Sequence, residues 1–172
     1  GGLASGATAS DGRRFLAGRV ICNGDPPTVY KQMMPGEVRS KRALPEAATQ
    51  YSMGLYVLFF GTKQKYEDVA HHTIWMGPRY RELLADIFDR KILADDFSLY
   101  LHRPTATDES FAPEGCDSFY VLCPVPNLLG DVDWSVEGQK LRDRIVAALE
   151  RTIMPGLSQS ITDDFWMTPE DF

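Results

Sequence analysis

Two adjacent histidines are the most conspicuous polar residues of this 172-residue chain. His71 and His72 fall in a segment that reads as a strand, where neighbouring side chains point to opposite faces. Such a pair cannot bind one metal ion together, and we expect one of the two to face inward. A hydrogen-bonded structural histidine is the favoured interpretation. The alternative is a proton carrier that accepts a proton or stabilises positive charge.

A second polar group stands where a later strand is expected to end. His102 and Arg103 are followed by Asp108, and such side chains form charge-assisted clusters. We favour an ion pair or a turn-bracing role over a place at an active site. His71, His72, Arg103 and Asp108 are thus the candidates for catalysis, although no motif gives any of them a role.

The paired acids Asp95-Asp96 and Asp163-Asp164 resemble a two-carboxylate centre only in composition. Neighbouring acids in loops usually cap helices or remain solvated, and we favour that interpretation over catalysis or metal binding.

Three cysteines give no evidence for disulfides or for a metal site. Cys22, Cys116 and Cys123 leave an odd thiol and lack the spacing of a small secreted disulfide framework, so we expect a reducing cytosol. Cys116 and Cys123 with His102 also lack the closely paired ligands of structural zinc sites. The sequence predicts no metal.

Composition indicates a globular chain and excludes some partners. Hydrophobic residues make up 44% and charged residues 24%, which fits one domain over residues 1–172. The net charge of -6 argues against nucleic acid. A basic cluster at Arg39, Lys41 and Arg42 is interpreted as a solvated loop, with an anionic lipid surface as the alternative. No apolar stretch reaches the roughly 18 residues of a membrane-spanning helix.

The elements that must position these residues follow from the hydrophobic pattern. Residues 51–60 (YSMGLYVLFF) predict a central strand covered on both faces, and residues 69–75, 97–101, 118–123 and 157–167 predict further strands. Helices are expected after Gly77-Pro78 and after Ser135, which we interpret as a helix cap, with Pro155-Gly156 ending the second helix. The N-terminal part predicts a turn over residues 10–12, a strand over 14–22, a short helix over 28–34 and a loop over 35–48. The pattern predicts an α+β fold with a largely antiparallel or mixed sheet flanked by helices.

Three segments carry a resemblance to a known family. They are residues 66–80, which begin YEDVAHHTIWM, residues 94–108 (ADDFSLYLHRPTATD) and the tail that includes residues 154–157 and 161–172. In order and spacing the chain from about residue 20 to its end resembles the middle of the bacterial phytoene desaturases.

The resemblance implies a two-domain, amine-oxidase-like flavoprotein whose FAD-binding half is built from both ends of a longer chain. We therefore expect this chain to be an excised substrate-binding part, inactive alone and without bound FAD, since no G-x-G-x-x-G turn occurs in it. Residues 1–34 would include the strand and turn that re-enter the flavin domain, with Asn23 and Asp25 near that domain, and residues 165–172 would lead back to it. A free-standing module that binds a hydrophobic ligand or a protein partner remains the alternative.

The resemblance also implies a polyene substrate, phytoene, desaturated toward lycopene or neurosporene; another carotenoid or a retinoid remains open. Tyr56, Leu58, Phe60 and Trp75 are the expected substrate-binding residues, although a purely structural role is equally open for the strand. We expect a cytoplasmic protein at the inner membrane surface, because its substrate is insoluble. Without its flavin domain, the chain is expected to expose an apolar patch and to self-associate.

Overall fold

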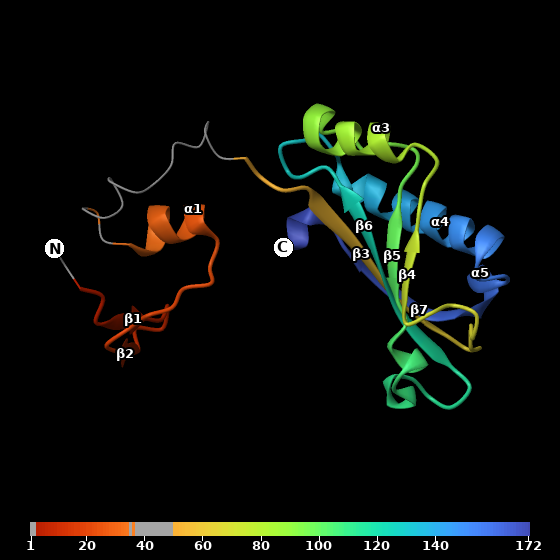
Figure 1. The fold of residues 1–172 in the computed structure, drawn as a ribbon, viewed down its shortest axis with the longest axis horizontal. Helices are drawn as coiled ribbons and strands as arrows, with labels where there is room; N and C mark the ends of the chain where they lie inside the picture. Colours follow the sequence, from red (N-terminus) through yellow and green to blue (C-terminus); the bar gives the residue numbers. More distant parts are fainter. Residues whose placement is uncertain (1–2, 35, 37–49) are drawn as a thin grey trace. The chain divides into compact units, whose positions relative to one another are not determined.

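The computed structural model describes residues 3–34, 36 and 50–172, and its contacts form two units, Gly1–Gln50 and Tyr51–Phe172 (Figure 1). Each unit is described by itself, and the single domain expected over residues 1–172 stays a prediction. The expected basic cluster, and almost all of the expected loop over residues 35–48, lie outside the described residues.

The first unit contains a short hairpin and a helical segment. Strand β1 (Gly6–Thr8) pairs antiparallel with β2 (Arg14–Leu16), and Asp11 holds the predicted turn by accepting a hydrogen bond from the Arg13 backbone N–H. Asp25 caps α1 (Pro26–Thr28), which continues as the π-helical η1 (Val29–Met33) and confirms the predicted helix. The strand predicted over residues 14–22 is wrong beyond Leu16. The hairpin partner pairs with only three of its residues, and the exposed remainder has no strand beside it among the described residues.

The second unit is built on an antiparallel sheet, which confirms the α+β prediction. Among the described residues it has five strands in the order β4-β5-β6-β3-β7. The strands are β3 (Gly54–Thr62), β4 (His72–Trp75), β5 (Leu99–His102), β6 (Asp117–Val125) and β7 (Ile161–Met167). As predicted, β3 is an interior strand, paired with β6 on one side and β7 on the other. The expected cover on both faces is wrong, because α4 packs on one face while Phe59 on the other is only partly buried.

Helices and short turns connect the strands. They are α3 (Tyr80–Ala85) with η3 (Asp86–Arg90), η4 (Pro104–Ala106), η5 (Glu109–Phe111), α4 (Trp134–Thr152), α5 (Leu157–Ser160) and η6 (Pro169–Asp171). The cap of α4 is Asp133, whose carboxylate accepts from the Ser135 N–H, so the prediction of Ser135 as the cap is wrong. The helix begins two residues earlier than a cap at Ser135 implies, and Asp133 therefore occupies the cap position.

The hydrophobic core lies between one face of the sheet and α4, which runs along that face in Figure 1. Leu141, Ile145 and Leu149 recur on one side of the helix and are fully buried. They meet Tyr56 and Leu58 of β3, and the Tyr56 hydroxyl donates to the Gly138 carbonyl at 2.9 Å. We call the opposite side of the sheet the open face. Its side chains are those that alternate with the core residues along each strand.

Candidate functional site

An aromatic row crosses the open face with one residue from each strand. In register, it consists of Phe165 on β7, Phe59 on β3, Tyr120 on β6, His102 on β5 and His72 on β4. Ring centroids of successive members lie 4.6, 5.9, 4.9 and 5.2 Å apart. Strands are spaced about 4.8 Å apart, so the row extends roughly 19 Å.

A hollow of about 470 Å³ opens beside this row. Phe59, Tyr120 and Phe165 form part of its wall, and Pro104 and Phe111 close it from the segment that follows β5. Phe165 and Phe111 are 57% and 61% exposed, so much of this apolar surface is accessible. The arrangement fits a flat, apolar ligand that lies across the sheet.

The residues expected to bind substrate lie mainly on the other side of the sheet. Tyr56 and Leu58 are fully buried in the core against α4, whereas Phe60 is buried but also borders the hollow. Trp75 packs against Phe97, and its indole N–H donates to the Thr152 hydroxyl at 3.2 Å. The open face, not the core face, therefore offers surface to a ligand.

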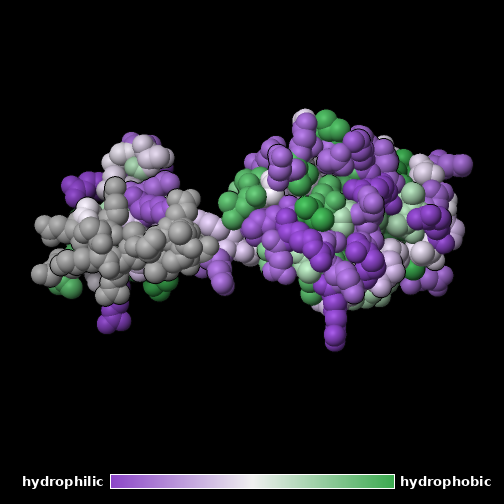
Figure 2. Space-filling view, turned by 90° about the horizontal axis from the view of Figure 1, so that it is seen from above, coloured by the Kyte–Doolittle hydropathy of each residue, from purple (hydrophilic) through white to green (hydrophobic). Residues whose placement is uncertain are grey.

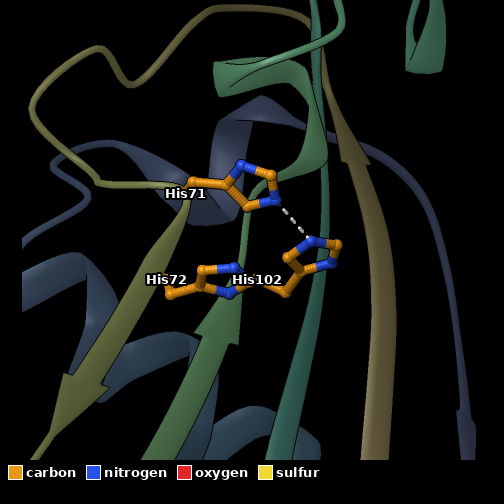
Figure 3. Close-up of side chains that lie close together, drawn as sticks. All are labelled: His71, His72 and His102. Carbon is orange, nitrogen blue, oxygen red and sulfur yellow. Dashed lines mark hydrogen bonds between the residues drawn. The ribbon is translucent and has the colours of Figure 1, made fainter.

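The three histidines converge at one end of the sheet. His71 lies in a bend before β4, so the alternation of strand side chains does not apply to it. Its ring stacks on His72 with centroids 4.3 Å apart, and its Nε2 lies 2.8 Å from Nε2 of His102. Figure 3 shows the three rings together. The expectation that His71 and His72 point to opposite faces is wrong, and the argument against a shared metal ion loses its basis.

Hydroxyl groups orient two of these rings. Nδ1 of His71 is hydrogen-bonded to the Thr107 hydroxyl, and Nδ1 of His72 lies 2.7 Å from the Tyr100 hydroxyl. Burial, with added repulsion from His71 and His72, lowers the pKa of His102 below its ordinary value of 6.5. This shift favours the neutral form of the His102 imidazole at neutral pH.

Arg103 and Asp108 do not join His102 in one cluster. Arg103 is buried on the core side, where it forms an ion pair with Asp117 at 3.2 Å and donates to the carbonyls of Tyr66 and Val69 at 2.6 and 2.7 Å. Asp108 is exposed and caps η5, and hydrogen bonds from Ser110 lower its pKa. Arg103 forms an ion pair and Asp108 braces a turn, in agreement with the structural roles favoured from the sequence.

The remaining acidic pairs are engaged in surface ion pairs or lie exposed. Asp96 accepts from Arg79 and Asp164 from Arg142, whereas Asp95 lies 3.5 Å from Arg144. Asp25 caps α1 in the first unit, and the expected position of Asn23 and Asp25 near a flavin domain stays a prediction.

The sequence pattern did not reveal the aromatic row. It assigned Phe59 to the second face of its strand, but Tyr120 and Phe165 lie 61 and 106 residues further along the chain. These residues become neighbours only through the pairing register of β3 with β6 and β7. The available signal was the alternation of Tyr120 with buried residues along β6, which marks a residue of the opposite face.

Comparison with known proteins reveals close relatives along nearly the whole chain. This chain is 48% identical over 166 residues to a lycopene-forming phytoene desaturase of Pantoea ananas. The alignment covers 94% of this chain and 33% of that protein. The chain is related to the phytoene desaturases. A lycopene-forming enzyme of a Paracoccus species is 46% identical, with 100% of this chain and 35% of the relative covered. The neurosporene-forming enzyme of Rhodobacter capsulatus is 42% identical, with 99% and 34% covered.

These relationships confirm the resemblance to phytoene desaturases. The chain spans about a third of the length of the curated relatives it matches. No protein-family model matches it.

Proposed function

We propose that this chain is the substrate-binding part of an FAD-dependent phytoene desaturase and that the polyene lies on the open face of its sheet. The aromatic row is the observation that carries the proposal. A hydrocarbon offers no hydrogen bonds, so its affinity must come from apolar area, at about 25 cal/mol per Å² removed from water. Rings aligned across five strands supply such area on a rigid support.

The aromatic row has one apolar end and one polar end, and this difference would orient a bound hydrocarbon along the row. Phe165 and Phe59 offer only carbon surface, whereas Tyr120 leads to the imidazoles of His102 and His72. We propose that the apolar end holds the polyene and excludes water from it, while the imidazole end marks where the apolar surface stops.

The described residues do not fit the phosphate groups of FAD. The sheet is antiparallel and lacks the parallel strand, Gly-rich turn and helix that cradle a pyrophosphate. At the N-terminus of α4, the Asp133 carboxylate occupies the place where an anion would bind. In our proposal FAD is held by parts of the complete protein outside this chain and supplies the redox chemistry, while these residues bind and orient the substrate.

The relatives' names suggest the class of substrate. Those enzymes form lycopene or neurosporene, and another relative, from Myxococcus xanthus, is named as a zeta-carotene-forming phytoene desaturase. We propose phytoene for this protein, with another carotenoid or a retinoid as the alternative that product analysis would identify. No interaction with nucleic acid is proposed, in keeping with the net charge of -6.

Association with a membrane surface follows from an insoluble substrate. No helix in the described part of the chain is long and apolar enough to cross a bilayer. Leu128 and Leu129 are 61% and 64% exposed, and Figure 2 shows hydrophobic residues gathered among hydrophilic ones on the second unit. We propose peripheral attachment through exposed apolar residues of this kind, and self-association of the isolated chain through the same surfaces.

Product analysis of the complete protein tests the proposal. It is expressed in a host that accumulates phytoene, and the carotenoids are extracted and separated. Phe165→Ala should lower desaturation roughly tenfold, because covering half of a large aromatic side chain contributes about 1 to 2 kcal/mol. Phe88→Ala is the matched control: Phe88 is 42% exposed but lies on η3 and does not line the hollow.

Equal activity of the Phe165 and Phe88 variants would remove the open face from the proposal. A reading frame without flavin motifs on either side of this segment would favour the free-standing binding module instead. That module would bind a hydrophobic ligand without producing desaturated products.

A further inference from the structure

All three histidines of the chain lie in one cluster. One ring nitrogen from each of His71, His72 and His102 lies within 4.8 Å of the others. Figure 3 shows that the rings come from the bend before β4, from the first residue of β4 and from the last residue of β5. His72 and His102 are direct cross-strand partners, so the backbone register itself brings two of them together.

The hydrogen bonds around the cluster leave nitrogen atoms available at its centre. Thr107 and Tyr100 engage Nδ1 of His71 and Nδ1 of His72, which fixes these rings and leaves their Nε2 atoms for other partners. Hydrogen bonds to the second ring nitrogen are the usual means by which proteins orient metal-binding histidines.

His102 is incompletely satisfied by the protein alone. Its Nε2 lies 2.8 Å from Nε2 of His71, but its Nδ1 is buried without a hydrogen-bond partner among the described residues. The hydrogen bond between His71 and His102 does not involve the His72 ring. A buried nitrogen without a hydrogen-bond partner also lowers the stability of the folded state. An ion shared by the three rings would use one nitrogen from each, whichever nitrogen His102 presents.

We propose that His71, His72 and His102 bind one divalent transition-metal ion of the zinc type. Imidazole nitrogen suits Zn²⁺, Cu²⁺ and Ni²⁺, whereas Ca²⁺ and Mg²⁺ require oxygen ligands. Tetrahedral zinc with Zn–N distances of about 2.0 to 2.1 Å separates its ligand nitrogens by roughly 3.3 Å. The three nitrogens here lie within 4.8 Å of one another, so ion binding would draw them slightly closer together. His72 is exposed, so a fourth position is open to water or to a ligand.

Metal titration of the 172-residue chain tests this site directly. The chain is prepared without a histidine tag, treated with chelator and titrated with Zn²⁺ by calorimetry and with Co²⁺ by visible absorption. We expect saturation at one ion per chain. In proton NMR spectra every imidazole signal should shift on addition of Zn²⁺, because the chain has three histidines and all belong to the site.

Four variants separate the histidines from other ligands. His71→Gln and His72→Gln should each lower the affinity more than a hundredfold, and Tyr100→Phe about tenfold because it frees the His72 ring. The double variant Cys22→Ser with Cys116→Ser is the control and should bind as the parent does, because these are the accessible thiols among the described residues. Tryptophan fluorescence in urea checks that each variant folds.

The proposal is overturned if the parent chain shows no saturable binding of Zn²⁺ or Co²⁺ up to millimolar concentration. It is also overturned if binding survives both histidine substitutions or disappears in the cysteine variant. His72→Gln keeps the test decisive if His71→Gln fails to fold, because the His72 side chain is exposed. None of these outcomes depends on desaturase activity, so failure here leaves the proposed function untouched.

Discussion

Asp117 is the residue whose loss should most damage the second unit. Its carboxylate is inaccessible to solvent and accepts hydrogen bonds from the Tyr66 N–H at 2.7 Å and the Thr105 hydroxyl at 2.6 Å. It also neutralises Arg103, whose side chain is 8% exposed. Asp117 thus joins the segment before β4, the end of β5 and the start of β6 at one point.

Asp117→Ala should lower the free energy of unfolding by about 3 to 5 kcal/mol, because it leaves the Arg103 charge buried without its counter-ion. Arg103 keeps its bonds to two backbone carbonyls, which places the expected loss toward the lower end of that range. With a urea m value of about 2 kcal/mol per M, the midpoint should fall by roughly 2 M.

Urea unfolding followed by tryptophan fluorescence measures this change, because all three tryptophans, Trp75, Trp134 and Trp166, lie in the second unit. Glu109→Ala is the matched control. It removes an ion pair with Lys65 in the same region, but the Glu109 side chain is 80% exposed and solvent screens the pair, so the urea midpoint should hardly move. A similar small loss for Asp117→Ala would refute the reasoning that burial makes this ion pair important.

Three further predictions concern the core face. Tyr56→Phe should cost about 1 kcal/mol in urea unfolding, because burial raises the pKa of Tyr56 and keeps its hydroxyl as the donor to Gly138; no change would mean that water replaces it. Gly138→Ala should destabilise the unit by about 1 to 3 kcal/mol despite the better helix propensity of alanine, because the added Cβ would lie 2.9 Å from Trp166 Nε1; a rise in the urea midpoint would contradict this. Burial raises the pKa of Cys123 to about 12, so a thiol reagent should label exposed Cys22 in the native chain and Cys123 only in urea, as peptide mass mapping would show.

The strands and the main helix could be predicted because their patterns are local. Leu141, Ile145 and Leu149 recur at helical spacing, and Pro155-Gly156 ends the helix within a few residues of Thr152. The last predicted strand was only partly right, because its first residues form α5 and β7 begins at Ile161. Element boundaries depend on which neighbours are available for pairing.

The side of the sheet that meets a ligand could not be predicted from β3 alone. Tyr56, Leu58 and Phe60 alternate with Leu55, Val57 and Phe59, so both faces are apolar and period-2 alternation cannot distinguish them. The distinction comes from α4, about 80 residues later, which covers the first set. The histidine cluster was missed for a similar reason. One residue, His71, lies just outside its strand, and the third ring arrives from β5.

The two faces of the sheet therefore differ in what covers their apolar side chains. The core face is covered by α4, and most of its large side chains are inaccessible within this unit, with Trp75 and Trp166 partly buried. On the open face Phe59 and Tyr120 are half-buried by their neighbours and Phe165 is 57% exposed. Aromatic side chains left at an accessible surface forgo the stabilisation that burial would bring. In our proposal the bound polyene provides that burial, so truncating Phe165 should reduce desaturation far more than it reduces the stability of the sheet.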